Sequence, residues 1–312
     1  GIVMGTAMAG IATIAYTQEA LTGASHKKVG PRFIPKILGN IAAANIAIDY
    51  NIQGPSFTVS TACSSGGDAI NTACMCMQSG KADIMLAVGA ESVLCPLVIY
   101  SLANAKALSR RNDSPSTASR PFDVTRDGFV IGEGGGALVL ETEEHALARG
   151  AKIYAEIRGC GNTDDAYHVT APHPEGRGAI ACMKQAIAEA GINPSDIGYI
   201  NAHGTATNKG DTVETSSIKK VFGNTLPYVS STKGATGHMM GAGGITETIT
   251  CVKAIETGTV PPTINLNEVD PECAGIDFVA NTAKKAEINF AMSNAFGFGG
   301  QNSSIIVGKY GK

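Results

Sequence analysis

The sequence lacks several features that mark common protein classes. It contains no tryptophan, only 16% of its residues are charged, and its formal net charge is −3, so no strongly basic surface for nucleic acid is expected. No apolar run reaches the ~18 residues that a membrane-spanning helix needs, and no signal-peptide pattern opens the chain. We therefore expect neither nucleic acid nor a membrane as a general partner.

Nucleotide and metal motifs are also missing. The 38 glycines gather in short turn-like clusters, and none of these has P-loop spacing or forms a strand-bounded Gly-x-Gly-x-x-Gly. The eight cysteines include no paired Cys-x-x-Cys units, so the pattern indicates neither a disulfide scaffold nor a zinc site. We predict a protein without cofactor or metal, and the reducing cytoplasm as its simplest setting.

What the sequence does contain is an alternation of strand and helix patterns over 312 residues, of which 44% are hydrophobic. This predicts an α/β architecture with buried sheets. The only seam is near Gly150, so we predict two domains, 1–150 and 151–312. Residues 1–8 already resemble a buried strand, which predicts that an N-terminal portion is missing. The other expected strands are 82–91, 136–141, 152–159, 197–202, 228–231, 288–293 and 304–307, and the expected helices are 143–149, 178–190, 211–222 and 243–256.

Cys63 stands where a strand pattern ends and a helix pattern begins. Phe57, Val59 and Thr61 alternate as in a strand, and apolar residues at helical spacing follow Cys63. The sulfur would lie at the helix N-terminus, where free N–H groups and the helix dipole favour a thiolate, so we expect a thiol activated without a neighbouring base. For a lone cysteine, inert core packing is the ordinary alternative.

Three further segments follow predicted strands, where functional side chains collect in open α/β sheets. They are Asn-Ala-His-Gly-Thr-Ala-Thr at 201–207, Ser-Thr-Lys-Gly-Ala-Thr-Gly-His at 231–238 and Asn-Ala-Phe-Gly-Phe-Gly-Gly at 294–300. With Thr-Ala-Cys-Ser-Ser at 61–65, these motifs resemble the β-ketoacyl-acyl-carrier-protein synthases, most closely the elongating type II enzymes, over essentially the whole chain. The resemblance implies a thiolase-like layered αβαβα fold of two similar halves, the N-terminal half incomplete by about a hundred residues.

The resemblance also implies an acyltransferase of fatty acid synthesis. Cys63 would take an acyl group from a thioester. His203 and His238, as neutral imidazoles, would donate N–H bonds to the enolate that forms when malonyl-acyl carrier protein loses carbon dioxide. The backbone N–H groups of Cys63 and Phe298 would form the oxyanion hole for acyl transfer.

Supporting and substrate positions follow from the same resemblance. Lys233 would lie inside the site, paired with Glu247, where its ammonium group stabilises anions. Asp211 would have a supporting role, although it and Glu247 are also explained by capping or pairing within the structure. Thr205 and Thr207 would contact the phosphopantetheine arm, because hydroxyls two residues apart on an extended segment can bond successive amides.

The implied acyl pocket includes Met8, at a homodimer interface, and Phe296, with Phe298 as its gate. The implied partner is an acidic acyl carrier protein, which needs a basic landing site. The candidates for this landing site are Lys27, Lys28, Lys106, Arg110 and Arg111.

The resemblance extends to plastid enzymes, so a plastid location is open if a transit peptide has been removed.

Other classes fit the motifs less well. A biosynthetic thiolase shares the fold but uses a second cysteine in a C-terminal Cys-x-Gly stretch, where this chain has Phe-Gly-Phe-Gly at 296–299. A cysteine hydrolase gives no reason for two histidines and Lys233, and a chain-length-setting subunit normally lacks the nucleophile that Cys63 supplies. A polyketide-type ketosynthase and a structurally competent but inactive fragment remain open.

Overall fold

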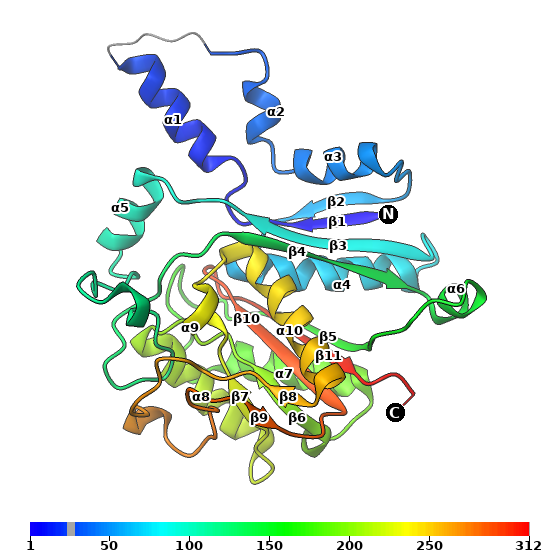
Figure 1. The fold of residues 1–312 in the computed structure, drawn as a ribbon, viewed down its shortest axis with the longest axis vertical. Coiled ribbons are helices and arrows are strands. Elements are labelled where there is room, and N and C mark those ends of the chain that lie inside the picture. The colour runs from blue at the N-terminus through cyan, green and yellow to red at the C-terminus, as the bar shows by residue number, and fades with distance from the viewer. Residues whose placement is uncertain (24–28, 312) are drawn as a thin grey trace.

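The computed structural model describes residues 1–23 and 29–311 and is built on two main β-sheets (Figure 1). The first sheet has the strand order β2-β1-β3-β4. Within it, Gly5 of β1 lies opposite Val59 of β2 and Gly89 of β3, so these three parallel strands end at one edge. The strands are β1 (Ile2–Gly5), β2 (Ser56–Val59), β3 (Ile84–Glu91) and β4 (Gly134–Glu141).

The second sheet has the order β5-β11-β10-β6-β7. Asn201 of β6 lies opposite Ser293 of β10 and Ser230 of β7, and the three strands are parallel. The segments that follow them therefore emerge at the same edge of the sheet. The strands are β5 (Glu156–Asp164), β6 (Ile197–Asn201), β7 (Tyr228–Ser230), β10 (Phe290–Phe296) and β11 (Gln301–Gly308), and a small separate sheet pairs β8 (Thr259–Val260) with β9 (Lys284–Lys285).

The two main sheets repeat one topology, as predicted. In the first, β1 pairs in parallel with β2 and β3, and β3 pairs antiparallel with β4. In the second, β6 pairs in parallel with β7 and β10, and β10 pairs antiparallel with β11. Only β5, at the outer edge of β11, has no counterpart beside β4 among the described residues.

Helices complete a layered α/β structure around these sheets. Two helices pack against each other between the sheets, and others cover the outer faces (Figure 1). The inner pair shares one apolar core that includes Ile70, Ile245 and Ile305. The inner helices are α4 (Ser65–Gln78) and α10 (Gly243–Thr257), α3 (Ile41–Asp49) packs on the first sheet, and α7 (Arg177–Ala190) packs on the second beside α8 (Asn208–Phe222).

Glycines allow α4 and α10 to cross closely. A Cβ on Gly66 would come within 2.7 Å of the backbone nitrogen of Ile245, and one on Gly244 would come within 2.4 Å of the nitrogen of Gly67. No side-chain movement relieves a clash with backbone, so these positions require glycine. This contact fixes α4, and with it the segment that carries Cys63, against the second half of the chain.

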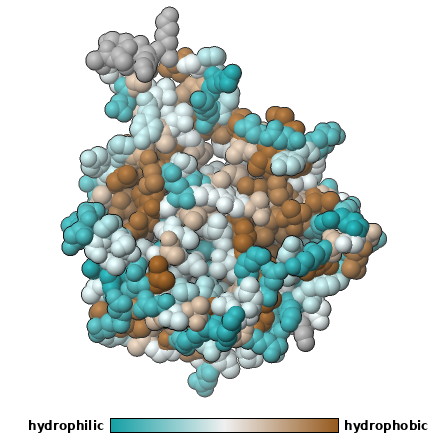
Figure 2. All heavy atoms as spheres, viewed as in Figure 1, coloured by the Kyte–Doolittle hydropathy of each residue, from teal (hydrophilic) through white to brown (hydrophobic). Residues whose placement is uncertain are grey.

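The α1–α2 arm extends away from the layers (Figure 1). It consists of α1 (Ile11–Thr22) and α2 (Phe33–Ile37), neither of which buries a residue in this chain. Exposed apolar side chains include Tyr16 and Ile34 on the arm and Val139 on β4. Figure 2, viewed from the same side as Figure 1, shows further patches of hydrophobic residues on that face of the molecule.

Most predicted elements are present with shifted ends, and one strand is misplaced. The strand expected at 152–159 is β5, Glu156–Asp164. The bounds of β5 are set by its antiparallel pairing with β11, in which Glu156 lies opposite Gly308 and Asp164 lies opposite Gln301. A local sequence pattern does not show which strand a segment will pair with. No helix among the described residues is long and apolar enough to cross a membrane. The remaining elements are α5 (Pro96–Asn104), α6 (Glu143–Ala148), α9 (Lys233–Thr236) and short 3₁₀ turns at Ala62–Ser64, Pro115–Thr117, Pro194–Asp196, Met240–Ala242 and Pro271–Cys273.

Candidate active site

Cys63 lies in the 3₁₀ turn that joins β2 to α4, as the strand-to-helix pattern predicts. Ala62 has a φ of 51°, an uncommon backbone conformation that turns the chain sharply before the helix. The buried Asp68 carboxylate, in the first turn of α4, accepts hydrogen bonds from Thr61 Oγ1 at 2.5 Å and Asn162 Nδ2 at 2.6 Å. Asn162 belongs to β5, so this carboxylate ties the Cys63 turn to the second sheet.

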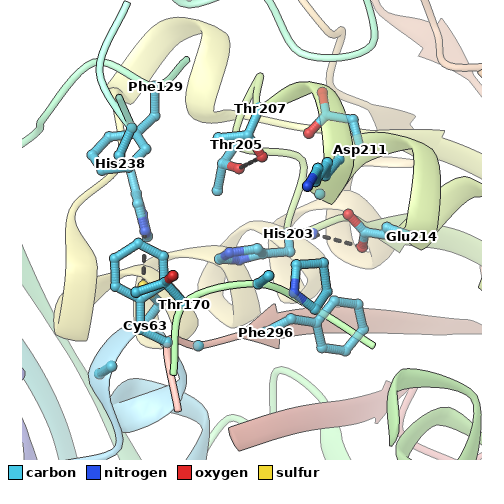
Figure 3. Close-up of a pocket in the computed structure, with 18 of the residues that line it drawn as sticks. Cys63, Phe129, Thr170, His203, Thr205, Thr207, Asp211, Glu214, His238 and Phe296 are labelled. Carbon is cyan, nitrogen blue, oxygen red and sulfur yellow. Dashed lines mark hydrogen bonds between the residues drawn. The ribbon is translucent and has the colours of Figure 1, made fainter. Parts of the chain in front are cut away.

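Two histidines from the second half of the chain meet Cys63 (Figure 3). His203 follows β6, and His238 follows α9. The Nε2 atom of His238 lies 3.0 Å from Cys63 Sγ, and the two imidazole rings lie edge to face with centroids 5.4 Å apart. Phe129 packs edge to face against His238 at 5.2 Å. One thiol and two imidazoles therefore share a single small volume.

Both imidazoles are uncharged at neutral pH, as expected. Burial, and then the positive charge of Lys233, hold the pKa values of His203 and His238 well below the usual value of 6.5. A neutral imidazole both donates and accepts one hydrogen bond. Each ring can thus offer an N–H group to a developing negative charge or a lone pair to a proton.

The expectation of a thiolate that needs no neighbouring base is wrong for the free protein. Burial raises the pKa of the Cys63 thiol to about 11, although a hydrogen bond from the Phe298 backbone N–H and the charge of Lys233 act in the opposite direction. Only 8% of Cys63 is exposed, so the cost of desolvating the thiolate outweighs these two opposing effects. His238 Nε2, at 3.0 Å, is positioned to accept the thiol proton.

Lys233 pairs with Glu247, as expected. Lys233 Nζ donates to Glu247 Oε1, and both side chains are almost fully buried. Lys233 begins α9, whose last residue precedes His238 by two positions, and Glu247 belongs to α10. The ion pair therefore joins the segment that positions His238 to one of the two inner helices.

Breaking this ion pair should strongly destabilise the fold. We expect Lys233→Met to lower the free energy of unfolding by about 3–5 kcal/mol, because it leaves a buried carboxylate without its cation. Urea denaturation would measure the change. The double variant Lys233→Met/Glu247→Leu should recover most of the loss, since apolar residues can replace a buried ion pair at little cost. A double variant less stable than the single one would contradict this explanation.

Asp211 supports the segment after His203 through backbone contacts. Its carboxylate accepts hydrogen bonds from the N–H groups of Phe122 at 2.8 Å and Ala206 at 3.1 Å, and it lies 3.6 Å from Arg126. Burial raises the pKa of Asp211 to about 6. Ala206 has a φ of 66°, so the carboxylate holds a strained turn in the His203 segment.

Glu214 is a supporting residue that the sequence reasoning missed. Its two carboxylate oxygens accept hydrogen bonds from the backbone N–H groups of His203 at 2.8 Å and Gly204 at 2.7 Å (Figure 3). Burial raises the pKa of Glu214 to about 7. The available signal was its spacing of three residues from Asp211, which puts both carboxylates on one face of α8.

Removing one of these acceptor oxygens should loosen His203. We expect Glu214→Gln to lower the free energy of unfolding by about 1–3 kcal/mol, because an amide NH₂ group would face one of the two backbone N–H groups. Urea denaturation would measure it, with the exposed Glu144→Gln on α6 as a control. Equal stability of the two variants would contradict this role for Glu214.

A cavity of about 570 Å³ opens over the three reactive side chains. The buried Thr205 and half-buried Thr207 line it, with their hydroxyl oxygens 3.1 Å apart (Figure 3). Met8 packs in the same apolar cluster as Cys63, and the Phe296 ring lies 6.0 Å from that of His203. Phe298 lines the cavity and is 39% exposed. The structure thus brings all of the expected pocket residues to one cavity.

The residues expected to dock a carrier protein are placed differently from one another. Lys106 is exposed and lines the cavity. Arg110 is exposed, whereas Arg111 is half-buried and donates a hydrogen bond to the Thr125 carbonyl at 3.2 Å. The other two candidates, Lys27 and Lys28, lie outside the described residues.

Glu91, at the end of β3, was also missed. Its buried carboxylate accepts hydrogen bonds from the backbone N–H groups of Ala7 at 2.6 Å, Met8 at 3.1 Å and Gly241 at 3.1 Å. It therefore fixes Met8 against the segment that follows His238. No motif in the sequence marks this residue, because its partners are backbone groups from distant segments.

Comparison with known proteins places the chain in a family. Residues 1–146 match the N-terminal domain of β-ketoacyl synthase, and residues 154–267 match its C-terminal domain. The chain belongs to the β-ketoacyl synthase family. It is 45% identical over 313 residues to "3-oxoacyl-[acyl-carrier-protein] synthase 2" of Rhizobium meliloti (strain 1021), covering 99% of this chain and 74% of that protein. A relative of the same name from Coxiella burnetii is also 45% identical, and the match covers 99% of this chain and 75% of that protein.

Solved structures of β-ketoacyl synthases show the same fold. A β-ketoacyl synthase from Burkholderia phymatum STM815 superimposes with a TM-score of 0.92 at 35% identity, covering 99% of this chain and 75% of that one. A second match is the complex AntDE:AntF, described as a type II polyketide acyl carrier protein with its ketosynthase. The TM-score is 0.93 at 35% identity, and the match covers 99% of this chain and 77% of that one. The thiolase-like layered fold expected for this family is confirmed.

Proposed function

We propose that this β-ketoacyl synthase condenses an acyl group, held on Cys63, with malonyl-acyl carrier protein. One observation carries the proposal: Cys63, His203 and His238 converge within 4.8 Å at a cavity where both imidazoles are neutral. A decarboxylative condensation needs a nucleophile for the acyl group and donors for an enolate, and this set contains both. The product is a 3-oxoacyl carrier protein lengthened by two carbons.

In the first half-reaction, Cys63 Sγ attacks the carbonyl carbon of the incoming thioester. The thiol proton passes to His238 Nε2, 3.0 Å away, and then to the sulfur of the departing carrier. The new bond is a thioester on Cys63, and the bond broken is the thioester to the carrier. Backbone N–H groups of Cys63 and Phe298 stabilise the tetrahedral oxyanion in this proposal, and the Phe298 N–H already reaches the thiol.

In the second half-reaction, the malonyl carboxylate leaves as carbon dioxide and its bonding electrons form an enolate. In this step His238 is the neutral tautomer that carries its proton on Nε2. N–H groups of His203 and His238 stabilise the enolate oxygen, and because the rings are neutral they need no prior protonation. The enolate carbon attacks the Cys63 thioester, the C–S bond breaks, and the departing Cys63 thiolate takes up one proton from solvent. In this scheme Lys233 and Glu247 hold the histidine segment, and Asp211 supports the segment after His203.

An acyl carrier protein is the partner in this proposal. The structure of the AntDE:AntF complex contains a ketosynthase with its acyl carrier protein, and the names of many curated relatives include the acyl carrier protein. Thr205 and Thr207 would bond the phosphopantetheine amides, and Lys106 at the cavity would meet the acidic carrier. Phe298 would move to admit the acyl chain beside Met8 and Phe296.

We also propose that the chain acts as a homodimer with two domains divided near Gly150. Each main sheet falls on one side of Gly150, and the two family matches are divided between 146 and 154. Apolar side chains such as Ile14 and Tyr16 on the α1–α2 arm are exposed in the single chain, and a partner subunit would cover them. Analytical ultracentrifugation would test the dimer.

The expected cytoplasmic location stays a prediction, and curated relatives include mitochondrial and chloroplastic proteins of Arabidopsis thaliana.

Fatty acid synthesis is favoured over a polyketide pathway. The curated relatives named 3-oxoacyl-[acyl-carrier-protein] synthase are 42–45% identical to the chain, whereas the ketosynthase of the type II polyketide complex AntDE:AntF is 35% identical. We expect malonyl-acyl carrier protein and saturated acyl donors to support condensation. The competing possibility is a chain that folds but lacks activity.

The test combines intact-mass analysis with the release of labelled carbon dioxide. With an acyl carrier protein thioester, the chain should gain one acyl mass, and malonyl-acyl carrier protein should then release carbon dioxide as 3-oxoacyl product forms. Prior alkylation of Cys63 should block the adduct. Product formed without any acyl adduct would overturn the mechanism, and the absence of both would support an inactive fragment.

A further inference from the structure

Cys63, His203 and His238 also have the geometry of a metal site. Among the described residues, they are the set of cysteine and histidine ligands whose donor atoms all lie within 4.8 Å of one another. In tetrahedral zinc sites, Zn–S bonds of ~2.3 Å and Zn–N bonds of ~2.0–2.1 Å put donor atoms roughly 3.5 Å apart. The Sγ to Nε2 distance of 3.0 Å between Cys63 and His238 is close to this value.

We propose that this cluster binds one Zn²⁺ ion through Cys63 Sγ, His203 and His238. Three protein ligands leave the fourth tetrahedral position open to the cavity, where a water molecule would complete the shell. Binding replaces the thiol proton of Cys63 with the metal, and the proton is released to solvent. No electron is transferred.

The chemistry of the site suits zinc better than a hard cation. Thiolate and imidazole ligands select zinc, whereas Mg²⁺ and Ca²⁺ need oxygen ligands. Among the described residues, neither ring has a hydrogen-bond partner for its Nδ1 atom, so no hydrogen bond at Nδ1 prevents the tautomer that offers the Nε2 lone pair. The nearby Lys233 charge is balanced by Glu247 in a buried ion pair.

Two carboxylates beside the cluster have other partners. Asp211 and Glu214 line the same cavity as the three ligands (Figure 3). Backbone N–H groups hold their oxygens, and Asp211 also lies 3.6 Å from Arg126, so neither carboxylate serves as a further ligand. The mouth also carries the ammonium groups of Lys106 and Lys209, which face more open surroundings.

Zinc binding and acylation of Cys63 should exclude each other. A sulfur in a thioester has no thiolate lone pair to give to the metal, and a metal-bound sulfur is not free to attack a thioester. This consequence rests on the proposed function, whereas zinc binding itself does not. Zinc would thus inhibit the enzyme reversibly by occupying its nucleophile.

Titration with zinc chloride, followed by metal analysis after gel filtration, tests the site without any activity assay. We expect one equivalent of zinc per chain. Cys63→Ala should weaken this binding by about 100-fold or more. The control is Cys74→Ser, which removes the one cysteine that is only half-buried and should leave zinc affinity unchanged. Equal affinity of Cys63→Ala and the unchanged chain would overturn the proposal.

Cobalt substitution identifies the ligands directly. Co²⁺ bound at the cluster should show thiolate-to-cobalt charge-transfer absorption, and His203→Ala and His238→Ala should each weaken it. Because a variant can fail to fold, the unchanged chain alkylated at Cys63 by iodoacetamide is the second comparison and should lose the band. Absence of the band from the unchanged chain would overturn the proposal. Zinc binding by a chain that never acylates would disprove the proposed function alone.

Discussion

Cys63→Ser is expected to reduce acyl transfer by roughly four orders of magnitude or more. A serine hydroxyl is a much weaker nucleophile than a thiol, and its proton is harder to remove. The site makes this worse, because Cys63 is only 8% exposed and burial already raises the pKa of its thiol to about 11. Neutral His238 is therefore a better acceptor for a thiol proton than for a hydroxyl proton, which is held still more tightly. Intact-mass analysis with an acyl carrier protein thioester would measure the acyl adduct.

Cys95→Ser provides the matched control for this substitution. Cys95 is buried in the same apolar cluster as Cys63, but it does not line the cavity. We expect this variant to acylate at close to the normal rate, with a modest loss of stability from a buried hydroxyl. Condensation by Cys63→Ser at the rate of the unchanged chain would show that the nucleophile is a different residue.

A glutamine at position 63 separates the two half-reactions. Its amide group has the shape of an acylated cysteine, so Cys63→Gln should form no acyl adduct while retaining or increasing the decarboxylation of malonyl-acyl carrier protein. Carbon dioxide release measures this directly. Loss of decarboxylation together with acylation, in a variant that is folded by circular dichroism, would argue against independent enolate stabilisation by the histidines.

The sequence was sufficient to predict the parts of the site that lie in continuous motifs. Cys63 follows β2 of the first sheet, whereas the segments of His203 and His238 follow β6 and β7, whose parallel pairing brings them to one edge of the second sheet. The two-halves topology followed from the family resemblance. The residues of the motifs therefore indicated both the fold and the chemistry.

Contacts between distant segments could not be predicted in this way. Glu214 and Glu91 act by accepting hydrogen bonds from backbone N–H groups. Any strand end or loop can supply such donors, so no sequence motif marks the contact. The expectation of a thiolate at Cys63 was wrong because it considered only the local helix terminus, whereas the burial that raises the pKa of the thiol is produced by packing of segments distant in the sequence. The position of β5 depended on its pairing with β11 in the same way.

His238→Ala is expected to lower decarboxylation by about 10²–10³-fold while the acyl adduct on Cys63 still forms. The lost Nε2–H group would leave the enolate oxygen with His203 as its remaining imidazole donor, and removal of one such donor costs roughly 3–4 kcal/mol. Acylation should slow less, because the backbone N–H groups that stabilise its oxyanion remain in place and the departing carrier sulfur can take the thiol proton. Intact mass and carbon dioxide release measure the two effects separately.

Two comparisons make this separation specific to His238. His145→Ala removes an outer histidine that is paired with Glu141, and it should change neither measurement. His203→Ala should impair decarboxylation to a similar degree but leave acylation closer to normal, since the Cys63 thiol lies 3.0 Å from His238 Nε2 and pairs with that ring. If His238→Ala formed no acyl adduct, its main role would be in activating Cys63, and enolate stabilisation would fall to His203. Unchanged decarboxylation would remove His238 from the second half-reaction, because a donor that contacts the enolate cannot be lost without cost.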